Sequence, residues 1–297
     1  MTYPLIFGEI LYDQFPDGAV LGGAPFNVAW HLQGFGLGPK IVSRVGNDAL
    51  GQQILREMQN WGMDASAIQL DEQHATGTVK VTLDEGQPEY DITHDVAYDH
   101  INIDDLLPAL KGKPPSLVYH GSLAARHVNS RSALMAMKQN LQSPVFVDIN
   151  LRAPWWKRDV LDELLSKASW LKINEHELML LSDTRTGNEN VLLDQAQSVR
   201  QKYNLSAVIV TLGERGAYIM DDNECYRSEP VPVDNLVDAV GAGDGFSAVT
   251  IAGLLQGWAF PLILQRATAF AAAICQQRGA INTDPGFYSR QLSEWNA

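Results

Sequence analysis

The chain opens with PLIFGEI (4–10), PFNVAWHLQGF (25–35), KIVSRV (40–45) and ALGQQILREMQNWGM (49–63). Short apolar runs therefore alternate with longer segments whose apolar residues recur at helical spacing. Strand, helix, strand and helix in this order are typical of β–α–β units. This stretch favours an α/β fold.

The second half of the chain repeats the same alternation. Its segments are SLVYHG (116–121), SALMAMKQNL (132–141), PVFVDIN (144–150), VLDELLSKA (160–168), WLKIN (170–174), a helical pattern over about 191–203, and AVIV (207–210). We therefore predict a central, mostly parallel sheet covered by helices on both faces.

Residues 76–93, TGTVKVTLDEGQPEYDIT, interrupt this rhythm. Near-alternation of β-branched and aromatic residues around the turn-prone Asp84-Glu85-Gly86 predicts a hairpin outside the main sheet. Together with the short segment 11–21 it could form a small β lid over the sheet edge where open α/β folds bind ligands. A surface hairpin without a role is the alternative. We expect one domain over 1–297, with lid segments at about 11–22 and 75–100.

The 297-residue chain carries 22 Lys and Arg against 35 Asp and Glu, which gives a formal net charge of −13 and a pI near 4.9. This acidic balance disfavours broad binding to nucleic-acid phosphates, so we expect no nucleic-acid partner. An apolar fraction of 45% excludes intrinsic disorder.

Three features predict a cytoplasmic protein without a membrane partner. Cys225 and Cys275 show neither a CxxC pair nor zinc spacing. Residues 1–15 lack the positive region and cleavage site of a signal peptide, and we interpret them as a strand. The apolar stretch 258–275 is interrupted by polar residues and a proline, which predicts a buried or half-buried helix rather than a membrane span.

Several common enzyme motifs are missing from the sequence. It contains no GxxxxGK[ST], no HExxH, no GxSxG, and no GxGxxG after the first strand. The missing glycine fingerprint argues against a dinucleotide-dependent oxidoreductase. The seven histidines show no ligand spacing, which favours surface or core roles over metal binding: His31, His74, His94, His100, His120, His127 and His176.

The strongest local pattern is DAVGAGDGFSAVTIAG (238–253), in which a glycine turn opens an apolar helix. Such a turn directs backbone N–H groups and the positive end of the helix dipole at one point, which suits a phosphate. Asp244 lies at the mouth of the turn, where a carboxylate could accept a proton from an attacking hydroxyl. A plain helix N-cap is the alternative for Asp244.

A second pattern, GGAPFNVAWHL (22–32), directly precedes a helix. Gly22 and Gly23 let backbone approach a small ligand, and Asn27 offers donors and acceptors for hydroxyl groups. Asp13, which ends the first strand pattern, could accept two hydroxyl hydrogen bonds. The pattern suits a polyol, with ordinary turns as the alternative.

Three further segments end predicted strands. Asn174 and Glu177 are spaced to reach a hydrated Mg²⁺ or a phosphate, although a capping box would look the same. The segment 211–216, TLGERG, could shape a nucleotide pocket or form a plain β-turn. Arg152 could supply a cation to a phosphate or serve in a buried strand-end ion pair.

Taken in order, these segments resemble the ribokinase-like sugar kinases, the PfkB carbohydrate kinase family. They are GGAPFNVA (22–29), DINLR (148–152), NEHE (174–177), TLGERG (211–216) and DAVGAGD (238–244). The resemblance spans nearly the whole chain and implies a three-layer fold with a β lid. It also implies ATP-dependent phosphorylation of a sugar hydroxyl, with sugar and ATP as small-molecule partners and a homodimer as one possible assembly.

The resemblance further implies roles for individual residues. Asp244 would be the base, and the backbone of Gly241, Ala242 and Gly243 the anion hole. The sugar would contact Asp13, Gly22, Gly23, Asn27 and Arg152. ATP would contact Asn174, Thr211, Gly213, Gly216 and Thr268. Glu177 would help to place Mg²⁺ through water, and a monovalent cation, usually K⁺, would involve Asp238, Val240 and Gly279.

Within the family, GGAPFNVA (22–29) and VDINLRAPWW (147–156) look most like fructokinases, which favours fructose. Two departures stand out: Ala239 replaces the family's usual Thr, and eight residues separate Asp13 from Gly22 where many relatives have a longer lid strand. A kinase for 2-keto-3-deoxygluconate, ribose or a nucleoside is the alternative of the same chemistry. A non-catalytic sugar sensor of this fold is the alternative of another class.

Overall fold

The computed structural model describes residues 3–16, 18–84, 87–106, 110, 112, 114–182 and 188–295. Within them, nine strands form one sheet, in which the seven strands from β11 to β5 are parallel and β12 and β13 are antiparallel. In spatial order they are β13 (Cys225–Arg227), β12 (Ala217–Met220), β11 (Ala207–Thr211), β10 (Trp170–Asn174), β9 (Val145–Asp148), β8 (Leu117–His120), β1 (Pro4–Phe7), β4 (Lys40–Gly46) and β5 (Ile68–Asp71). The predicted mostly parallel sheet is confirmed.

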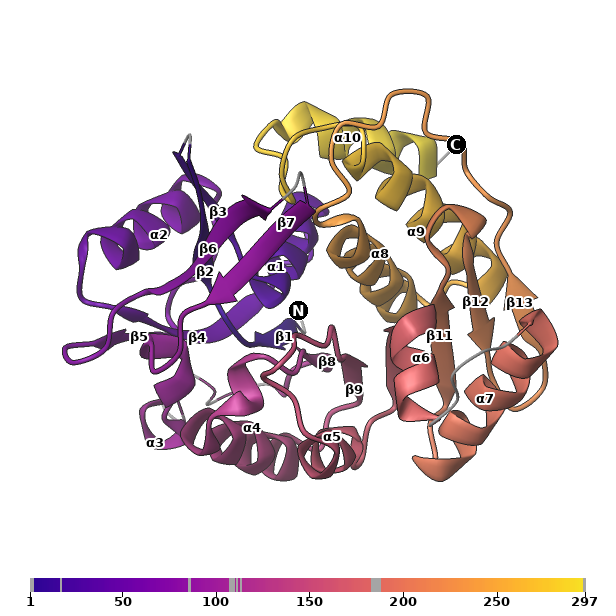
Figure 1. The fold of residues 1–297 in the computed structure, drawn as a ribbon, viewed down its shortest axis with the longest axis horizontal. Coiled ribbons are helices and arrows are strands. Elements are labelled where there is room, and N and C mark those ends of the chain that lie inside the picture. Colours follow the sequence, from indigo (N-terminus) through magenta and orange to yellow (C-terminus); the bar gives the residue numbers. More distant parts are fainter. Residues whose placement is uncertain are drawn as a thin grey trace.

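Helices cover both faces of this sheet (Figure 1). The central strands β1, β8 and β9 are buried along their whole length, because each of their faces packs on one helical layer. One layer holds α3 (Ile103–Leu106), α4 (Val128–Leu141), α5 (Arg158–Leu165), α6 (Glu175–Leu181) and α7 (Glu189–Lys202). The other holds α1 (Ala24–Gly34), α2 (Ala49–Asn60), α8 (Ala242–Gln256), α9 (Phe260–Ile274) and α10 (Pro285–Trp295).

A second, four-stranded sheet joins two distant parts of the chain (Figure 1). Its order is β3 (Gly18–Gly22), β2 (Leu11–Phe15), β6 (Gly77–Asp84) and β7 (Gln87–Ile92). The predicted hairpin and the segment 11–21 therefore do pair in a small sheet. Of the predicted turn, Glu85 and Gly86 lie outside the described residues.

Two expectations about single elements need refinement. Residues 1–15 do not form one strand: β1 belongs to the main sheet and β2 to the small one. The apolar stretch 258–275 holds α9, and its buried residues pack in the core beside α8. Among the described residues no helix combines the length and apolar character needed to cross a bilayer.

Candidate active site

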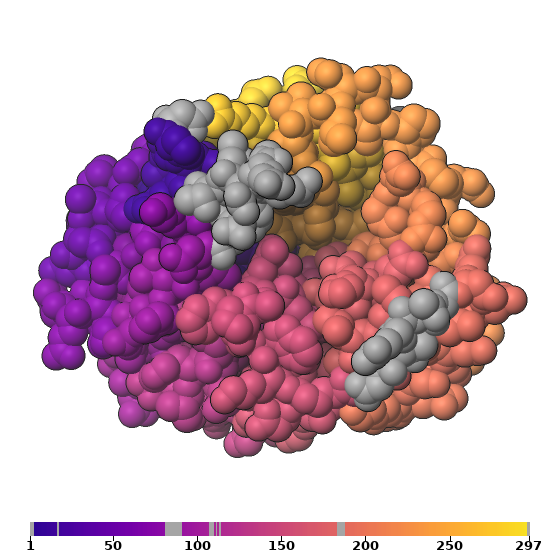
Figure 2. Space-filling view, viewed as in Figure 1, coloured from indigo at the N-terminus to yellow at the C-terminus, as the bar shows by residue number. Residues whose placement is uncertain are grey.

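The carboxyl ends of the central strands border a cavity of about 560 Å³. Lining residues follow directly after β1, β8 and β9, and the start of α8 closes one end. Figure 2 shows this face hollowed between the small sheet and the second half of the chain. Ligands of open α/β sheets bind at this edge, and the volume is typical of small-molecule sites. The lining includes Glu9, Asp13, Gly23, Asn27, Asp148, Arg152, Lys172, Asn174, Glu177, Thr211, Asp238, Val240, Gly241, Gly243 and Asp244.

The helix α8 begins at the cavity because Gly241 turns the chain there. Gly241 has a φ of +82°, and a Cβ at this position would lie 2.4 Å from the Cα of Ala280, so only glycine fits. Ala242, Gly243 and Asp244 form the first turn, whose N–H groups lack acceptors within the helix. This end of α8 can therefore bind the negative charge of a phosphoryl group.

Asp244 is the buried carboxylate of that first turn. Burial raises its pKa to about 7, a hydrogen bond from Asn27 opposes the rise, and the charge of Asp148 adds to it. The Nδ2 atom of Asn27, in α1, donates to Oδ2 of Asp244 at 2.7 Å. A carboxylate with this pKa can take up and release a proton near neutral pH.

Glu9, which follows β1 after Gly8, is a second buried carboxyl that the sequence patterns did not single out. Burial raises its pKa to about 7, and the charge of Asp244 contributes to the rise. Within the described residues, Glu9 Oε2 and Asn27 Oδ1 are buried and have no hydrogen-bond partner. Both residues line the cavity, so the site holds acceptors that match the hydroxyl donors of a bound molecule.

Asp13 reaches the cavity from the small sheet. The prediction that Asp13 ends the first strand is wrong. Asp13 lies within β2, where it pairs with Val20 and Val79. Burial raises its pKa to about 6, while the nearby charge of Arg152 opposes the rise. Gly22 pairs with Leu11 of the same strand, and a Cβ on Gly22 would lie 2.9 Å from Oδ2 of Asp13, so glycine leaves room for this carboxylate.

A buried ion pair supports the other side of the cavity. Lys172 Nζ donates to Asp148 Oδ2 at 2.7 Å, and Ser247 Oγ donates to the same oxygen at 2.8 Å. Burial lowers the pKa of Lys172, but the charge of Asp148 more than offsets it, so the pKa is raised. Sequence reasoning gave these residues no role. The one available hint was a charged residue inside the otherwise apolar strand WLKIN (170–174).

Asn174 and Glu177 form a capping box at the start of α6. The side chain of Asn174 accepts from the N–H of Glu177 at 2.9 Å, and Glu177 Oε2 accepts from the N–H of Asn174 at 2.8 Å. The other oxygen of Glu177 accepts from the N–H of Leu151 at 2.7 Å. Both residues also line the cavity. The capping alternative therefore accounts for their contacts, and the same residues would still lie beside a bound ligand.

The residues suggested for a monovalent cation are brought together in the fold. Asp238 Oδ1 accepts from the N–H of Val240 at 3.0 Å, and Oδ2 accepts from the N–H of Gly279 at 3.1 Å. Asp238 and Val240 line the cavity. The group therefore lies beside the turn that opens α8.

Other predicted residues are not in the cavity lining: Gly22, Gly213, Gly216, Ala242, Thr268 and Gly279. Gly213 begins the 3-10 turn η3 (Gly213–Arg215), which lies shortly after the lining residue Thr211, and Gly216 follows this turn. Thr268 lies in α9, and its Oγ1 is buried without a partner among the described residues. The cavity as it stands therefore does not reach Thr268.

Comparison with known proteins agrees with this architecture. A family model for pfkB family carbohydrate kinases matches residues 16–285. The sugar kinase PH1459 of Pyrococcus horikoshii is 29% identical over 88% of this chain and 83% of its own. A fructokinase of Klebsiella pneumoniae is 29% identical over 94% and 92%, and a 2-dehydro-3-deoxygluconokinase of Bacillus subtilis is 28% identical over 89% and 83%.

Solved structures show the same fold. The structure of PH1459 aligns with a TM-score of 0.84 at 26% identity over 100% of both chains. Its complex with ATP aligns with a TM-score of 0.77 at 25% identity over 93% of both chains. Because the family model spans most of the sequence and the structures match its whole length, this chain belongs to the pfkB family of carbohydrate kinases and is a sugar kinase with the ribokinase-like fold.

Proposed function

We propose that this kinase transfers the γ-phosphoryl group of ATP to a hydroxyl of fructose. The observation that carries the proposal is the buried Asp244 at the start of α8, hydrogen-bonded to Asn27 and with its pKa raised to about 7. Asp244 takes the proton of the sugar hydroxyl while the hydroxyl oxygen bonds to the γ-phosphorus. The bond from that phosphorus to the bridging oxygen breaks, and ADP leaves with the bond's electrons.

The first turn of α8 stabilises the charge that develops during this transfer. Backbone N–H groups of Gly241 and Gly243 would face a transferring phosphoryl group beside the base, and the N–H of Ala242 would join them on releasing its 3.3 Å contact to the carbonyl oxygen of Ala239. The capped strand end at Asn174 and the turn at Thr211, Gly213 and Gly216 hold the nucleotide on the same side. The ATP complex of PH1459 supports ATP as the donor. Thr268 joins this set only if the cavity opens toward α9.

A neutral, hydroxyl-rich sugar suits the other end of the cavity. Glu9 and Asp13 place two carboxyl groups there, Asp244 adds a third from the phosphoryl end of the cavity, and Oδ1 of Asn27 is an unpartnered acceptor. Arg152 is the cation whose charge acts on all three carboxyls. Carboxylates accept hydrogen bonds from hydroxyls and repel a carboxylate substrate. Gly22 and Gly23 have no side chains, so they let the backbone on this side of the cavity approach the sugar.

The alternative substrate is an acid sugar such as 2-keto-3-deoxygluconate. The observation in its favour is Arg152, which lines the cavity and could pair with a substrate carboxylate. The Bacillus subtilis relative carries that activity in its name. The excess of carboxyl groups around Arg152 makes us prefer fructose.

The proposal includes two metal ions, and the residues present fit both. Carboxylate and amide oxygens are suitable Mg²⁺ ligands, and Mg²⁺ usually keeps several waters. Glu177 already accepts two backbone N–H bonds, so it would reach Mg²⁺ through water. Asp238, with backbone near Val240 and Gly279, would hold K⁺ beside the anion hole. A cytoplasmic location and a homodimeric assembly complete the proposal.

The test is an ATP turnover assay with Mg²⁺ and K⁺ over fructose, ribose, tagatose, 2-keto-3-deoxygluconate and nucleosides. The highest kcat/KM with fructose is the expected result. Preference for 2-keto-3-deoxygluconate would replace the substrate and keep the chemistry, and Arg152→Gln should then lose it. Sugar binding without turnover on any substrate would overturn the enzymatic proposal in favour of a sensor.

A further inference from the structure

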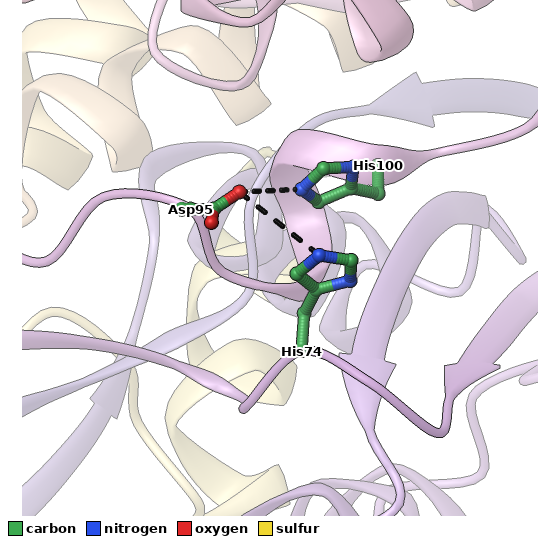
Figure 3. Close-up of side chains that lie close together, drawn as sticks. All are labelled: His74, Asp95 and His100. Atoms are coloured by element: carbon green, nitrogen blue, oxygen red, sulfur yellow. Dashed lines mark hydrogen bonds and ion pairs between the residues drawn. The ribbon is translucent and has the colours of Figure 1, made fainter.

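Two histidines and an aspartate come together at the base of the small sheet, away from the cavity lining (Figure 3). His74 lies between β5 and β6, Asp95 follows β7, and His100 ends the 3-10 turn η1 (Ala97–His100). Nε2 of His100 is 2.9 Å, and Nε2 of His74 is 4.0 Å, from Oδ1 of Asp95. Asp95 and His100 are close in sequence, but His74 lies about twenty residues before them, so only the fold brings the three side chains together.

The separations match what a small cation requires. Imidazole nitrogens and carboxylate oxygens bind Zn²⁺ at about 2.0–2.2 Å, so two ligands of a tetrahedral ion lie roughly 3.4 Å apart. The observed 2.9 and 4.0 Å lie on either side of this value. The two imidazole rings stack with centroids 3.7 Å apart and 14° between planes, and Figure 3 shows both ring edges facing Asp95. Small side-chain rotations would therefore bring all three ligand atoms around one ion.

Each histidine ring makes a second contact through Nδ1, on the side away from Asp95, as metal-binding histidines usually do. Nδ1 of His74 lies 3.1 Å from Oδ2 of the buried Asp71, a carboxylate anchored by Arg44 at 2.6 Å. Nδ1 of His100 accepts from Nδ2 of Asn129 in α4 at 3.1 Å. Exchanging the amide nitrogen and oxygen of Asn129 would let Nδ1–H donate to Oδ1 instead, as metal binding by Nε2 requires. These outer contacts leave Nε2 of each ring free to face Asp95. A carboxylate–histidine pair of this kind orients the ring and strengthens its metal-binding nitrogen.

An ion can reach the cluster from solvent. The side chain of Asp95 is 64% exposed, whereas those of His74 and His100 are 24% and 16% exposed. The ring of His127 packs against that of His100, with the centroids 4.8 Å apart. Three protein ligands with an open fourth position for water form a common zinc arrangement.

We propose that His74, Asp95 and His100 form a binding site for a divalent transition-metal ion, with Zn²⁺ as the best match to two imidazoles and one carboxylate. The ligands lie just before β6 and just after β7, so the ion ties together the two connections by which this hairpin joins the main domain. Metal binding requires an unprotonated nitrogen on each imidazole, so affinity falls at low pH. This site is separate from the Mg²⁺ and K⁺ positions and does not depend on the sugar.

The test is a titration of the chelator-treated, untagged full chain with Co²⁺ and Zn²⁺ in excess Mg²⁺, which competes for the oxygen ligands of the cavity. We expect one equivalent of Co²⁺ to give a visible absorption band of a nitrogen- and oxygen-ligated ion, and Zn²⁺ to displace it. His74→Ala combined with His100→Ala should weaken binding at least ~100-fold, and Asn129→Ala about 10-fold through the outer contact. Zn²⁺ should raise the melting temperature of the wild type but not of the double variant.

His94→Ala is the matched control, because it removes an exposed imidazole next to Asp95 that lies outside the cluster. It should bind Co²⁺ as the wild type does. Asp95→Asn keeps the side-chain shape and covers the case in which the double variant does not fold; it should weaken binding more than His94→Ala. Binding that is unchanged in both Asp95→Asn and the double variant, or no stoichiometric binding by the wild type, would overturn the site.

Discussion

The two ends of the cavity are built differently. At the phosphoryl end, each functional side chain is held by buried partners: Asn27 donates to Asp244, and Lys172 and Ser247 both donate to Asp148. These residues belong to helices and strands of the main sheet and its covering layers. Their positions are fixed before any ligand arrives, which favours electrostatic stabilisation of a transition state.

The sugar end rests partly on the small sheet. Asp13 comes from β2, and Val79 and Ile92 line the cavity from β6 and β7. Among the described contacts, no cationic side chain donates a hydrogen bond to Asp13. The Lys172–Asp148 pair at the other end has no counterpart here. We infer that the main domain carries the phosphoryl-transfer chemistry, while the small sheet governs which sugar is accepted.

Apart from substitution of Asp244, the largest expected effect concerns the phosphoryl end of the cavity. Lys172→Met leaves the carboxylate of Asp148 buried without its ion-pair partner, which should cost about 3–5 kcal/mol of unfolding free energy. Urea unfolding measures this loss. Lys202→Met removes a lysine of similar geometry from an exposed pair with Asp162, in which the side chains are 49% and 44% exposed. Its cost should stay below about 1 kcal/mol, and equal losses would contradict the distinction between the two ends.

The next effect concerns the sugar end. Asp13→Ala removes a charged acceptor for sugar hydroxyls, and such hydrogen bonds contribute about 1.5–3 kcal/mol. The KM for the sugar should rise roughly 10- to 150-fold, while kcat changes little. Gln14→Ala is the control, because Gln14 is an exposed neighbour in the same strand and does not line the cavity. A loss of kcat with unchanged KM in Asp13→Ala would assign this carboxylate to the chemistry instead.

A smaller effect is the dependence of activity on pH. Burial raises the pKa of both Asp244 and Glu9 to about 7, and the two carboxyls influence each other, so the profile reports values of the pair. Because the base must be ionised, kcat/KM should rise about tenfold per pH unit below roughly pH 7 and level off above it. Initial rates at saturating ATP measure the profile. A flat profile between pH 5.5 and 8 would contradict it.

Stability should change with pH in the opposite direction. The pKa values of Glu9 and Asp244 are higher in the folded protein than the usual values of 4.5 and 3.8. The folded state therefore binds more protons, and the stability from these groups is present below about pH 4 and lost as pH rises through about 7. Asp244→Asn should be more stable than the wild type at pH 8, with a smaller difference at pH 5. Melting temperatures at the two pH values test this.

Local patterns predicted much of this molecule. The glycine turn and helix at 238–253 could be found because backbone geometry, helix and carboxylate all lie within sixteen residues of sequence. The alternation of strands and helices predicted the parallel sheet, and the β-branched hairpin predicted the small one.

Features that depend on distant contacts were missed. In the sequence, Glu9 is a single polar residue after an apolar strand. Only the fold brings it close enough to Asp244 for the two charges to interact. The Lys172, Asp148 and Ser247 contacts join segments up to 99 residues apart. Asp13 was placed at a strand end because β1 and β2 follow each other closely and give one continuous apolar pattern. His74 and His100 come together through the connections of the small sheet, which no sequence spacing records.

The central claim is that Asp244 accepts the proton of the sugar hydroxyl. The most direct measurement is kcat with fructose and Mg-ATP for the wild type and Asp244→Asn, with the dissociation constant of fructose determined by calorimetry for both. The account predicts that kcat falls about 10²–10⁴-fold while the dissociation constant changes by less than about tenfold. Near-wild-type turnover by Asp244→Asn, or loss of fructose binding that accounts for the whole defect, would contradict it.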